Sequence, residues 1–117
     1  MLLSLSDTKV YLCLHPTDMR KSFDGLSAVV QGVLSKDPFC GHLFVFRNKA
    51  GDRIKVLAWD GTGFSLFYKR LEKGKFHWPR IVEGTIEIRG SELNLLLEGM
   101  DWRRLSVKEN SRPITAI

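Results

Sequence analysis

Residues 42–79, HLFVFRNKAGDRIKVLAWDGTGFSLFYKRLEKGKFHWP, constrain the fold of this chain more than any other part of the sequence. They contain three runs rich in β-branched and aromatic residues, separated at 48–52 and 60–63 by segments rich in Asn, Asp and Gly. Such a pattern is typical of antiparallel strands joined by hairpin turns. We therefore predict three strands, at 44–47, 53–59 and 64–71.

The two hairpins also predict which side chains share a face of the sheet. If both turns close symmetrically, residue 46 faces residue 54 and residue 59 faces residue 64. Successive side chains of a strand point to opposite faces, so this register assigns each residue to a side. One side would carry an apolar floor for a helix, made of Phe44, Phe46, Ile54, Val56, Ala58 and Phe67.

The opposite face is divided along its length in this register. Apolar side chains such as Leu57 and Trp59 lie toward one end, which requires a cover in a folded domain. Toward the other end lie four cations and one aromatic side chain, which are Arg47, Arg53, Lys55, Tyr68 and Arg70. Cations of this kind are rarely buried, so we expect this end of the face to be open to solvent.

The segment before this stretch predicts a buried strand followed by a helix. Residues 10–14, VYLCL, form a short apolar run that stops at His15-Pro16. Apolar residues then recur every three or four positions, as one face of a helix requires, at Met19, Phe23, Leu26, Val30 and Val33. Either Thr17 or Ser22 would be the N-cap, depending on where this helix begins.

Small residues lie on a neighbouring face of the same helix, at Gly25, Ala28 and Gly32. Glycine within a helix costs about 1 kcal/mol relative to alanine, so its repeated use suggests a close approach of backbones. Two alternatives remain open at this point. The face either packs tightly within the chain or forms a contact between two copies of it, as in a homo-oligomer.

The segment after the central stretch predicts a strand and a second, shorter helix. Residues 85–88 are typical of a short edge strand, and Ser91 is a suitable N-cap for the helix SELNLLLEG. Leu93, Leu96 and Leu97 form its apolar face, and Gly99 is suited to end it. This helix is the expected cover for the apolar end of the second sheet face.

These elements predict a single α+β domain over residues 1–102. It would contain a mainly antiparallel sheet of about four to five strands, with one longer helix on one face and a short C-terminal helix. Residues 103–117 have no hydrophobic periodicity and are expected to form a flexible C-terminal tail.

Charge is concentrated in the middle of the chain. The formal net charge is +5, and residues 36–80 hold ten Lys or Arg against four Asp or Glu, a net charge of +6. No apolar run approaches the roughly 18 residues of a membrane span, and the N-terminal residues do not resemble a secretory signal, so we expect a cytoplasmic protein. Cys13 and Cys40 lack metal-ligand spacing and are expected to be buried or half-buried free thiols.

The sequence contains no recognisable catalytic or cofactor motif. Phosphate-binding glycine loops, nucleophile elbows and zinc-protease signatures are all missing, so no cofactor or metal is expected. Five carboxylates remain as a weak hypothesis for a metal-dependent nuclease, namely Asp18, Asp24, Asp52, Asp60 and Glu72. Helix starts and turns favour acidic residues for local reasons, which explains most of these positions without catalysis.

A basic surface containing an aromatic side chain is typical of nucleic-acid binding. Lys and Arg neutralise phosphates, and aromatic rings stack on unpaired bases. Charge and register predict a DNA-binding set of Arg47, Arg53, Lys55, Tyr68, Lys69, Arg70, Lys73 and Lys75. The alternatives are a solvated basic face with no such role and a surface for an acidic or aromatic protein partner.

Three segments of the chain resemble a known family: PTDMRKSFDGL at 16–26, the stretch 42–79, and LLLEGMDW at 95–102. Together they resemble the small accessory proteins called TnpB, or Orf-two-like proteins, of the IS-sixty-six class of bacterial insertion sequences. The resemblance covers roughly residues 9–102. The chain departs from the family pattern at Ser22, where glycine is common, at Ala50, where a basic residue is common, and at Ala58, where an aromatic is common.

The resemblance implies a non-enzymatic accessory role in DNA transposition, beside a separate transposase. It implies no catalytic residues. The leading hypothesis is therefore an accessory factor that contacts DNA through a basic sheet surface. The alternative is an adaptor that docks on the transposase of the same element without binding DNA itself.

Overall fold

The structure, a computed structural model, describes residues 8–81 and 83–103. Five strands and two helices follow each other in the order β1 (Val10–Cys13), α1 (Phe23–Gly32), β2 (Leu43–Arg47), β3 (Arg53–Trp59), β4 (Phe64–Arg70), β5 (Thr85–Ile88) and α2 (Gly90–Leu97). None of the helices formed by these residues has the length and apolar character of a membrane-crossing helix. The predicted α+β class and all seven predicted elements are confirmed.

The sheet is mixed, and the prediction of a mainly antiparallel sheet is wrong. Its strand order is β4-β3-β2-β1-β5, with β1 parallel to β2 and the other neighbours antiparallel. Parallel neighbours need a crossover connection, and the segment holding α1 supplies one between β1 and β2. The short strand β1 consequently lies inside the sheet, and the last strand, β5, forms one edge beside it.

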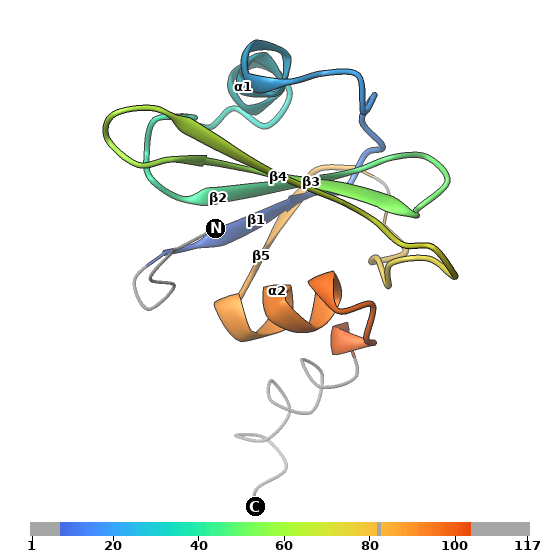
Figure 1. Cartoon of the computed structure of the whole chain (residues 1–117). Coiled ribbons are helices and arrows are strands. Elements are labelled where there is room, and N and C mark those ends of the chain that lie inside the picture. The colour runs from blue at the N-terminus through green and yellow to red at the C-terminus, as the bar shows by residue number, and fades with distance from the viewer. Residues whose placement is uncertain (1–7, 82, 104–117) are drawn as a thin grey trace, which may run out of the picture.

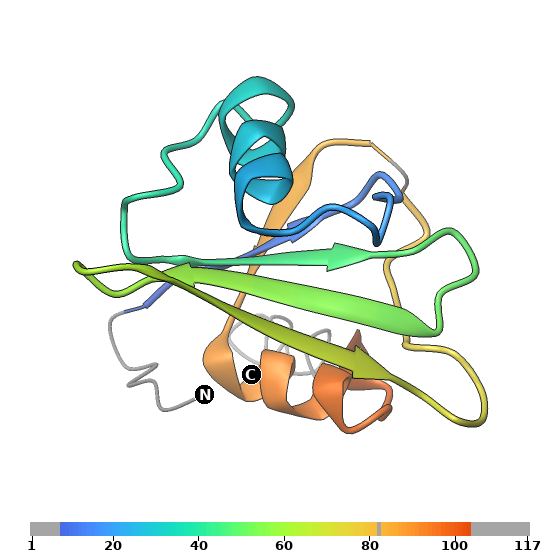
Figure 2. The same ribbon diagram turned by 45° about the horizontal axis from the view of Figure 1, so that its top comes forward.

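The sheet separates two apolar layers, with α1 on one face and α2 on the other (Figure 1 and Figure 2). On the α1 side, Leu26 and Val30 of the helix pack with Phe44, Phe46 and Leu57 of the sheet. On the α2 side the layer is larger, and it includes Leu12, Leu43, Val45, Ile54, Val56, Phe76, Trp78, Leu93, Leu96 and Trp102. A sheet covered on both faces explains why β2 and β3 are apolar at almost every position.

The register of the first hairpin differs from the prediction by one residue. Phe46 pairs with Lys55 and Arg47 with Ile54, whereas the second hairpin pairs Trp59 with Phe64 as predicted. The cause is Asn48, whose backbone N–H donates to the carbonyl of Arg53 at 3.1 Å. Its side-chain Oδ1 accepts from the backbone N–H of Arg53 at 3.0 Å. Asn48 is thus the last paired residue and not the first residue of the loop.

A shift of one residue reverses the faces of a strand. Phe44 and Phe46 therefore lie on the α1 side with Leu57, whereas Ile54, Val56 and Ala58 lie on the α2 side. The predicted floor, which combined these two groups on one face, is wrong. The apolar residues of β2 and β3 are those predicted. Only the pairing register between β2 and β3 differs from the prediction.

Helix α1 is shorter than its apolar pattern suggested. It begins at Phe23, with Ser22 as the N-cap, and the residues from Pro16 to Lys21 form a loop. Leu26 and Val30 are buried as predicted, but Phe23 is 43% exposed and Val33 is 66% exposed. Gly32 has open space where a side chain would begin, so tight packing at this glycine is not found within the described residues.

Helix α2 ends at the glycine that the sequence indicated. Gly99 has φ of +79°, its N–H donates to the carbonyl of Leu96, and the N–H of Met100 donates to that of Leu95. This is the Schellman arrangement, which requires a left-handed residue after the helix. The helix begins at Gly90, one residue before the predicted N-cap, because Glu92 accepts from the backbone N–H of Arg89 at 2.7 Å.

Replacement of Gly99 should destabilise the domain. Gly99→Ala forces a side chain into the left-handed region, and we expect it to lower the free energy of unfolding by about 1 kcal/mol. Urea titration followed by circular dichroism would measure the change.

Gly63→Ala is the matched control, since Gly63 lacks a positive φ and has open space around it. This variant should leave stability within about 0.5 kcal/mol of the unmodified protein. Equal losses in the two variants would contradict the role given to Gly99.

Candidate nucleic-acid interface

The predicted basic residues do not all lie on one face of the sheet. Arg53 pairs with Arg70, and Lys55 with Tyr68, so these four share one face as predicted. That face is the α1 side, and the prediction that they lie on the face opposite the first helix is wrong. The shifted register places Arg47 on the opposite side, and the prediction that it shares their face is wrong. Lys69 lies on that opposite side too, and Lys73 and Lys75 follow β4 in the next loop.

Two of the predicted cations hold parts of the fold together. Lys55 is only 6% exposed, and its Nζ donates to the carbonyls of Met19 and Lys21 at 2.7 and 2.8 Å. Its ammonium also lies 4.6 Å from the ring centre of Tyr68. The Nζ of Lys69 donates to the carbonyl of Leu97 at 2.6 Å, where the negative end of a helix dipole favours a cation.

The remaining members of the α1-side set are open to solvent. Tyr68 is 48% exposed, and its hydroxyl accepts from Nη1 of Arg53 at 3.3 Å. Arg70 donates to Glu72 at 3.0 Å, and this carboxylate raises the pKa of Arg70 above its ordinary value. An exposed ion pair of this kind contributes little stability and exchanges readily, so Arg70 stays accessible to another anion.

Arg47 is a half-buried cation whose side-chain hydrogen bond and ring contact are both made to neutral groups. Its Nη2 donates to the carbonyl of Leu14 at 3.2 Å, and its guanidinium carbon lies 5.7 Å from the ring centre of Trp78. Burial lowers the pKa of Arg47 below its ordinary value. No carboxylate of the described residues forms an ion pair with it.

Arg47 lies in the wall of a cleft of about 780 Å³ at the hairpin end of the sheet. We call this space the basic cleft. Its lining contains five cations, one imidazole and one carboxylate, together with small and apolar residues. The charged or titratable members are Arg47, Lys49, Lys73, Lys75, His77, Glu98 and Arg103. The net positive lining makes an anion the expected ligand.

Three segments far apart in the sequence build the basic cleft: the end of β2 with the β2–β3 loop, the residues after β4, and the residues after α2. The first two are joined by backbone hydrogen bonds, from Leu71 to the carbonyl of Asp52 at 2.9 Å and from Phe76 to that of Gly51 at 2.8 Å. Gly51 has φ of +80°, and a side chain at this position would contact Lys75. These bonds hold the lysines of the two loops around a common space.

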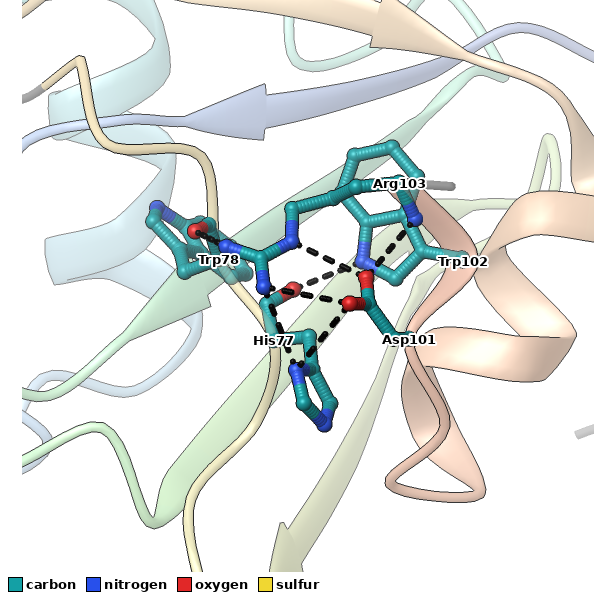
Figure 3. A network of polar contacts seen from close by, with 5 residues as sticks. All are labelled: His77, Trp78, Asp101, Trp102 and Arg103. Atoms are coloured by element: carbon teal, nitrogen blue, oxygen red, sulfur yellow. Dashed lines mark hydrogen bonds and ion pairs between the residues drawn. The ribbon is translucent and has the colours of Figure 1, made fainter. Parts of the chain in front are cut away.

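Arg103 closes the third wall through a network of polar contacts (Figure 3). Its guanidinium donates to the carbonyl of Trp78 at 2.8 Å and to Asp101 Oδ1 at 3.0 Å, and it lies 3.3 Å from Nδ1 of His77. The hydrogen bond from Arg103 lowers the pKa of Asp101 below its ordinary value. Trp102 adds a bond from Nε1 to the carbonyl of His77 at 2.7 Å.

Two cations of the cleft were missed by reasoning from the sequence, as was His77. Lys49 was treated only as part of a turn, although its charge in a loop beside basic strands was a usable signal. Arg103 was assigned to the tail, whereas it is bound to the domain; residues 104–117 of that predicted tail lie outside the described residues. No local pattern indicated a role for Arg103, because two of its three partners, His77 and Trp78, lie 25 or 26 residues away in the chain. Only Asp101 is close to it in the sequence.

Three of the five carboxylates considered for a nuclease have partners two residues away in the chain. Asp18 bonds to Arg20, which lowers the pKa of Asp18 to about 2, Asp60 bonds to Thr62, and Glu72 bonds to Arg70. Within residues 8–81 and 83–103, no group of three or more His, Cys, Asp or Glu side chains has the geometry to hold a metal ion. Cys13 and Cys40 are both free thiols. Cys13 is buried as predicted, whereas Cys40 is exposed, so the prediction of burial is wrong for Cys40.

Comparison with known proteins finds one family and two relatives. Residues 8–107 match the family described as IS66 Orf2 like protein. The chain is 40% identical over 105 residues to the uncharacterized protein y4jC of Sinorhizobium fredii, and 45% identical over 103 residues to the uncharacterized protein y4hO of the same organism. Each alignment covers about nine tenths of both chains. No solved structure matches the chain.

The contacts of Lys55 predict that this residue supports the fold. Lys55→Met keeps the aliphatic chain but leaves the carbonyls of Met19 and Lys21 without their donor. We expect a loss of about 1–3 kcal/mol in the free energy of unfolding, measured by urea titration.

Lys49→Met removes the same charge from an exposed loop position and is the matched control, with an expected change within about 0.5 kcal/mol. A Lys55→Met protein as stable as this control would show that the buried ammonium is not needed by the fold.

Proposed function

We propose a function from one premise, that the chain belongs to the IS66 Orf2-like family, whose role is that of an accessory protein in transposition. The proposed function is that of a non-enzymatic accessory factor, acting in the cytoplasm, that contacts the DNA of its element. The contact would be made by the hairpin end of the sheet. Its affinity would come mainly from phosphate neutralisation and would therefore depend little on base sequence.

One observation carries this proposal: cations of separate segments gather at a single end of the molecule. Five cations line the basic cleft, and half-buried Arg53 and exposed Arg70 lie at the same end on the α1 side. Among the described residues, only Arg103 of the five cleft cations is in an ion pair, with Asp101. Cations without internal partners remain available to an external polyanion.

The predicted residues would take different parts in this contact. Arg53, Arg70, Lys73 and Lys75 would meet phosphates directly, and Tyr68 would pack beside them. Arg47, Lys55 and Lys69 would act less directly. Arg47 would add charge from within the wall of the cleft, and the other two would hold the loop before α1 and the end of α2 in place.

A second candidate function, an adaptor that docks on the transposase, is favoured by a separate surface. Phe39 is 50% exposed and lies 5.0 Å from the ring centre of Trp59 and 5.3 Å from that of Phe64. This aromatic cluster of Phe39, Trp59 and Phe64 lies at the β3–β4 turn, away from the cations. Exposed aromatic residues are enriched at sites where proteins associate.

Salt dependence tests the proposed contact with DNA. The logarithm of the binding constant should fall linearly with the logarithm of salt concentration. The double variant Arg53→Gln/Arg70→Gln should flatten this slope by about two units, because each phosphate contact contributes roughly one. Fluorescence anisotropy of labelled DNA at several salt concentrations would give the slopes.

The control variant is Lys9→Gln/Lys36→Gln, which removes two cations near the opposite end of β1 and β2. Lys9 precedes Val10, which pairs with Leu43, and the ammonium of Lys36 lies over the ring of Tyr11. The slope of this variant should match that of the unmodified protein. No measurable binding at low salt would rule out the DNA contact.

The adaptor candidate predicts a different result. Phe39→Ser should weaken association with the transposase of the same element at least tenfold, an effect expected when a buried aromatic anchor is lost. Its DNA binding should not change. Isothermal titration calorimetry with the purified transposase measures the association, and equal affinity of Phe39→Ser and the unmodified protein would exclude the aromatic cluster as the docking surface.

A further inference from the structure

The basic cleft is concave and has the size of a small-molecule site. Its volume of about 780 Å³ lies within the range of about 300–1,000 Å³ found for pockets that enclose single ligands. A space of this size receives one or a few nucleotide units but cannot enclose a double helix. The size of the cleft therefore restricts the form of nucleic acid that reaches its walls.

The cations of the cleft surround the space and do not form a row. Lys49 belongs to the β2–β3 loop, Lys73 and Lys75 to the residues after β4, and Arg103 to the residues after α2. A duplex presents its phosphates on the outside of a rod, which fits a flat or gently curved surface. Cations on several walls of one cleft instead fit a single backbone that passes between them.

The wall behind the lysines contains hydrogen-bond donors that have no acceptor. Nε of Arg47 and Nε1 of Trp78 are both buried and unpaired within the described part of the chain, and Trp78 is only 8% exposed. Buried donors without partners are unfavourable and usually have an explanation in function. A phosphate in the cleft would supply the negative charge that the desolvated guanidinium of Arg47 lacks.

The cleft also contains aromatic surface beside its cations. His77 lines the space with its ring partly exposed, and its position is held by Arg103 and by the bond from Trp102. Rings next to cations allow a base to stack while its phosphate is neutralised. Charge, size and aromatic content thus favour a nucleotide unit over a simple inorganic anion.

We propose that the basic cleft binds a segment of single-stranded DNA, with a phosphate held between Lys49, Lys75 and Arg47 and a base beside His77. This inference rests on the proposed function and narrows its substrate class. Double-stranded DNA would contact only the outer surface, through Arg53 and Arg70. The protein would accordingly act where the strands of the element are separated, as they are at a nicked or unwound end.

Binding to paired and unpaired DNA separates these two surfaces. We would measure the affinity of the full chain for a short labelled thymidine oligonucleotide and for a duplex of equal length, at one low salt concentration. The single strand should bind more tightly than the duplex. Lys49→Gln/Lys75→Gln should weaken single-strand binding about tenfold or more, as expected for the loss of two phosphate contacts, and should change duplex binding much less.

Lys9→Gln/Lys36→Gln removes the same number of charges away from the cleft, and it should bind both forms like the unmodified protein. Photocrosslinking of a single strand containing iodo-deoxyuridine gives an independent readout. Crosslinked peptides should come from residues 47–51, 71–78 and 98–103, which contain the lining of the cleft. Crosslinks confined to other segments would overturn the proposal.

The remaining outcomes distinguish the inference from the function on which it rests. If DNA binds but Lys49→Gln/Lys75→Gln has no effect, the cleft is not the site, and the wider DNA contact survives. If the variant loses duplex binding equally, the cleft does not select single strands. If polyglutamate competes as well as DNA, the cleft is a site for acidic protein partners. If no DNA binds at all, both proposals fail.

Discussion

The side chain and backbone of Asn48 determine how the two halves of the molecule are related. Asn48 accepts hydrogen bonds from Gly51 and Arg53 and donates one to Asp52, so it fixes both the loop and the pairing of β2 with β3. This pairing decides which residues meet α1 and which meet α2. The loop that it shapes also accepts the hydrogen bond from Phe76, which brings the residues after β4 to the basic cleft.

Much of the fold could be predicted from the sequence, because the information was local. Hydrophobic periodicity predicted the strands and helices. The ease with which glycine adopts a positive φ predicted that α2 ends at Gly99. The order of the strands and the register of the first hairpin could not be predicted in the same way. The predicted loop of five residues, 48–52, and the observed loop of four, 49–52, both contain turn-forming Gly and Asp. Only the hydrogen bonds between Asn48 and Arg53 decide between the two loops. The parallel pairing of β1 and β2 likewise depends on contacts across α1.

The candidate site was less predictable, since the fate of a cation depends on its distant neighbours. Lys55 and Lys73 cannot be distinguished from the sequence. In the structure, Lys55 is buried against two carbonyls before α1, whereas Lys73 lines an open cleft. Arg103 lies next to the residues that fix it only after the chain has folded back from α2 toward His77 and Trp78. Charge composition indicated residues 36–80, which supply four of the five cations of the basic cleft, whereas Arg103 is brought to the cleft by tertiary structure alone.

The pairing of β3 on both sides has a mechanical consequence. This strand runs from Arg53 at the cationic end to Trp59 in the aromatic cluster, and β2 and β4 hold it along its length. Seven residues of extended chain span about 20 Å. A nucleic acid at one end and a protein at the other would consequently be kept at a fixed separation, with no hinge between them. The domain would then serve as a rigid spacer that sets the distance and orientation of two bound molecules.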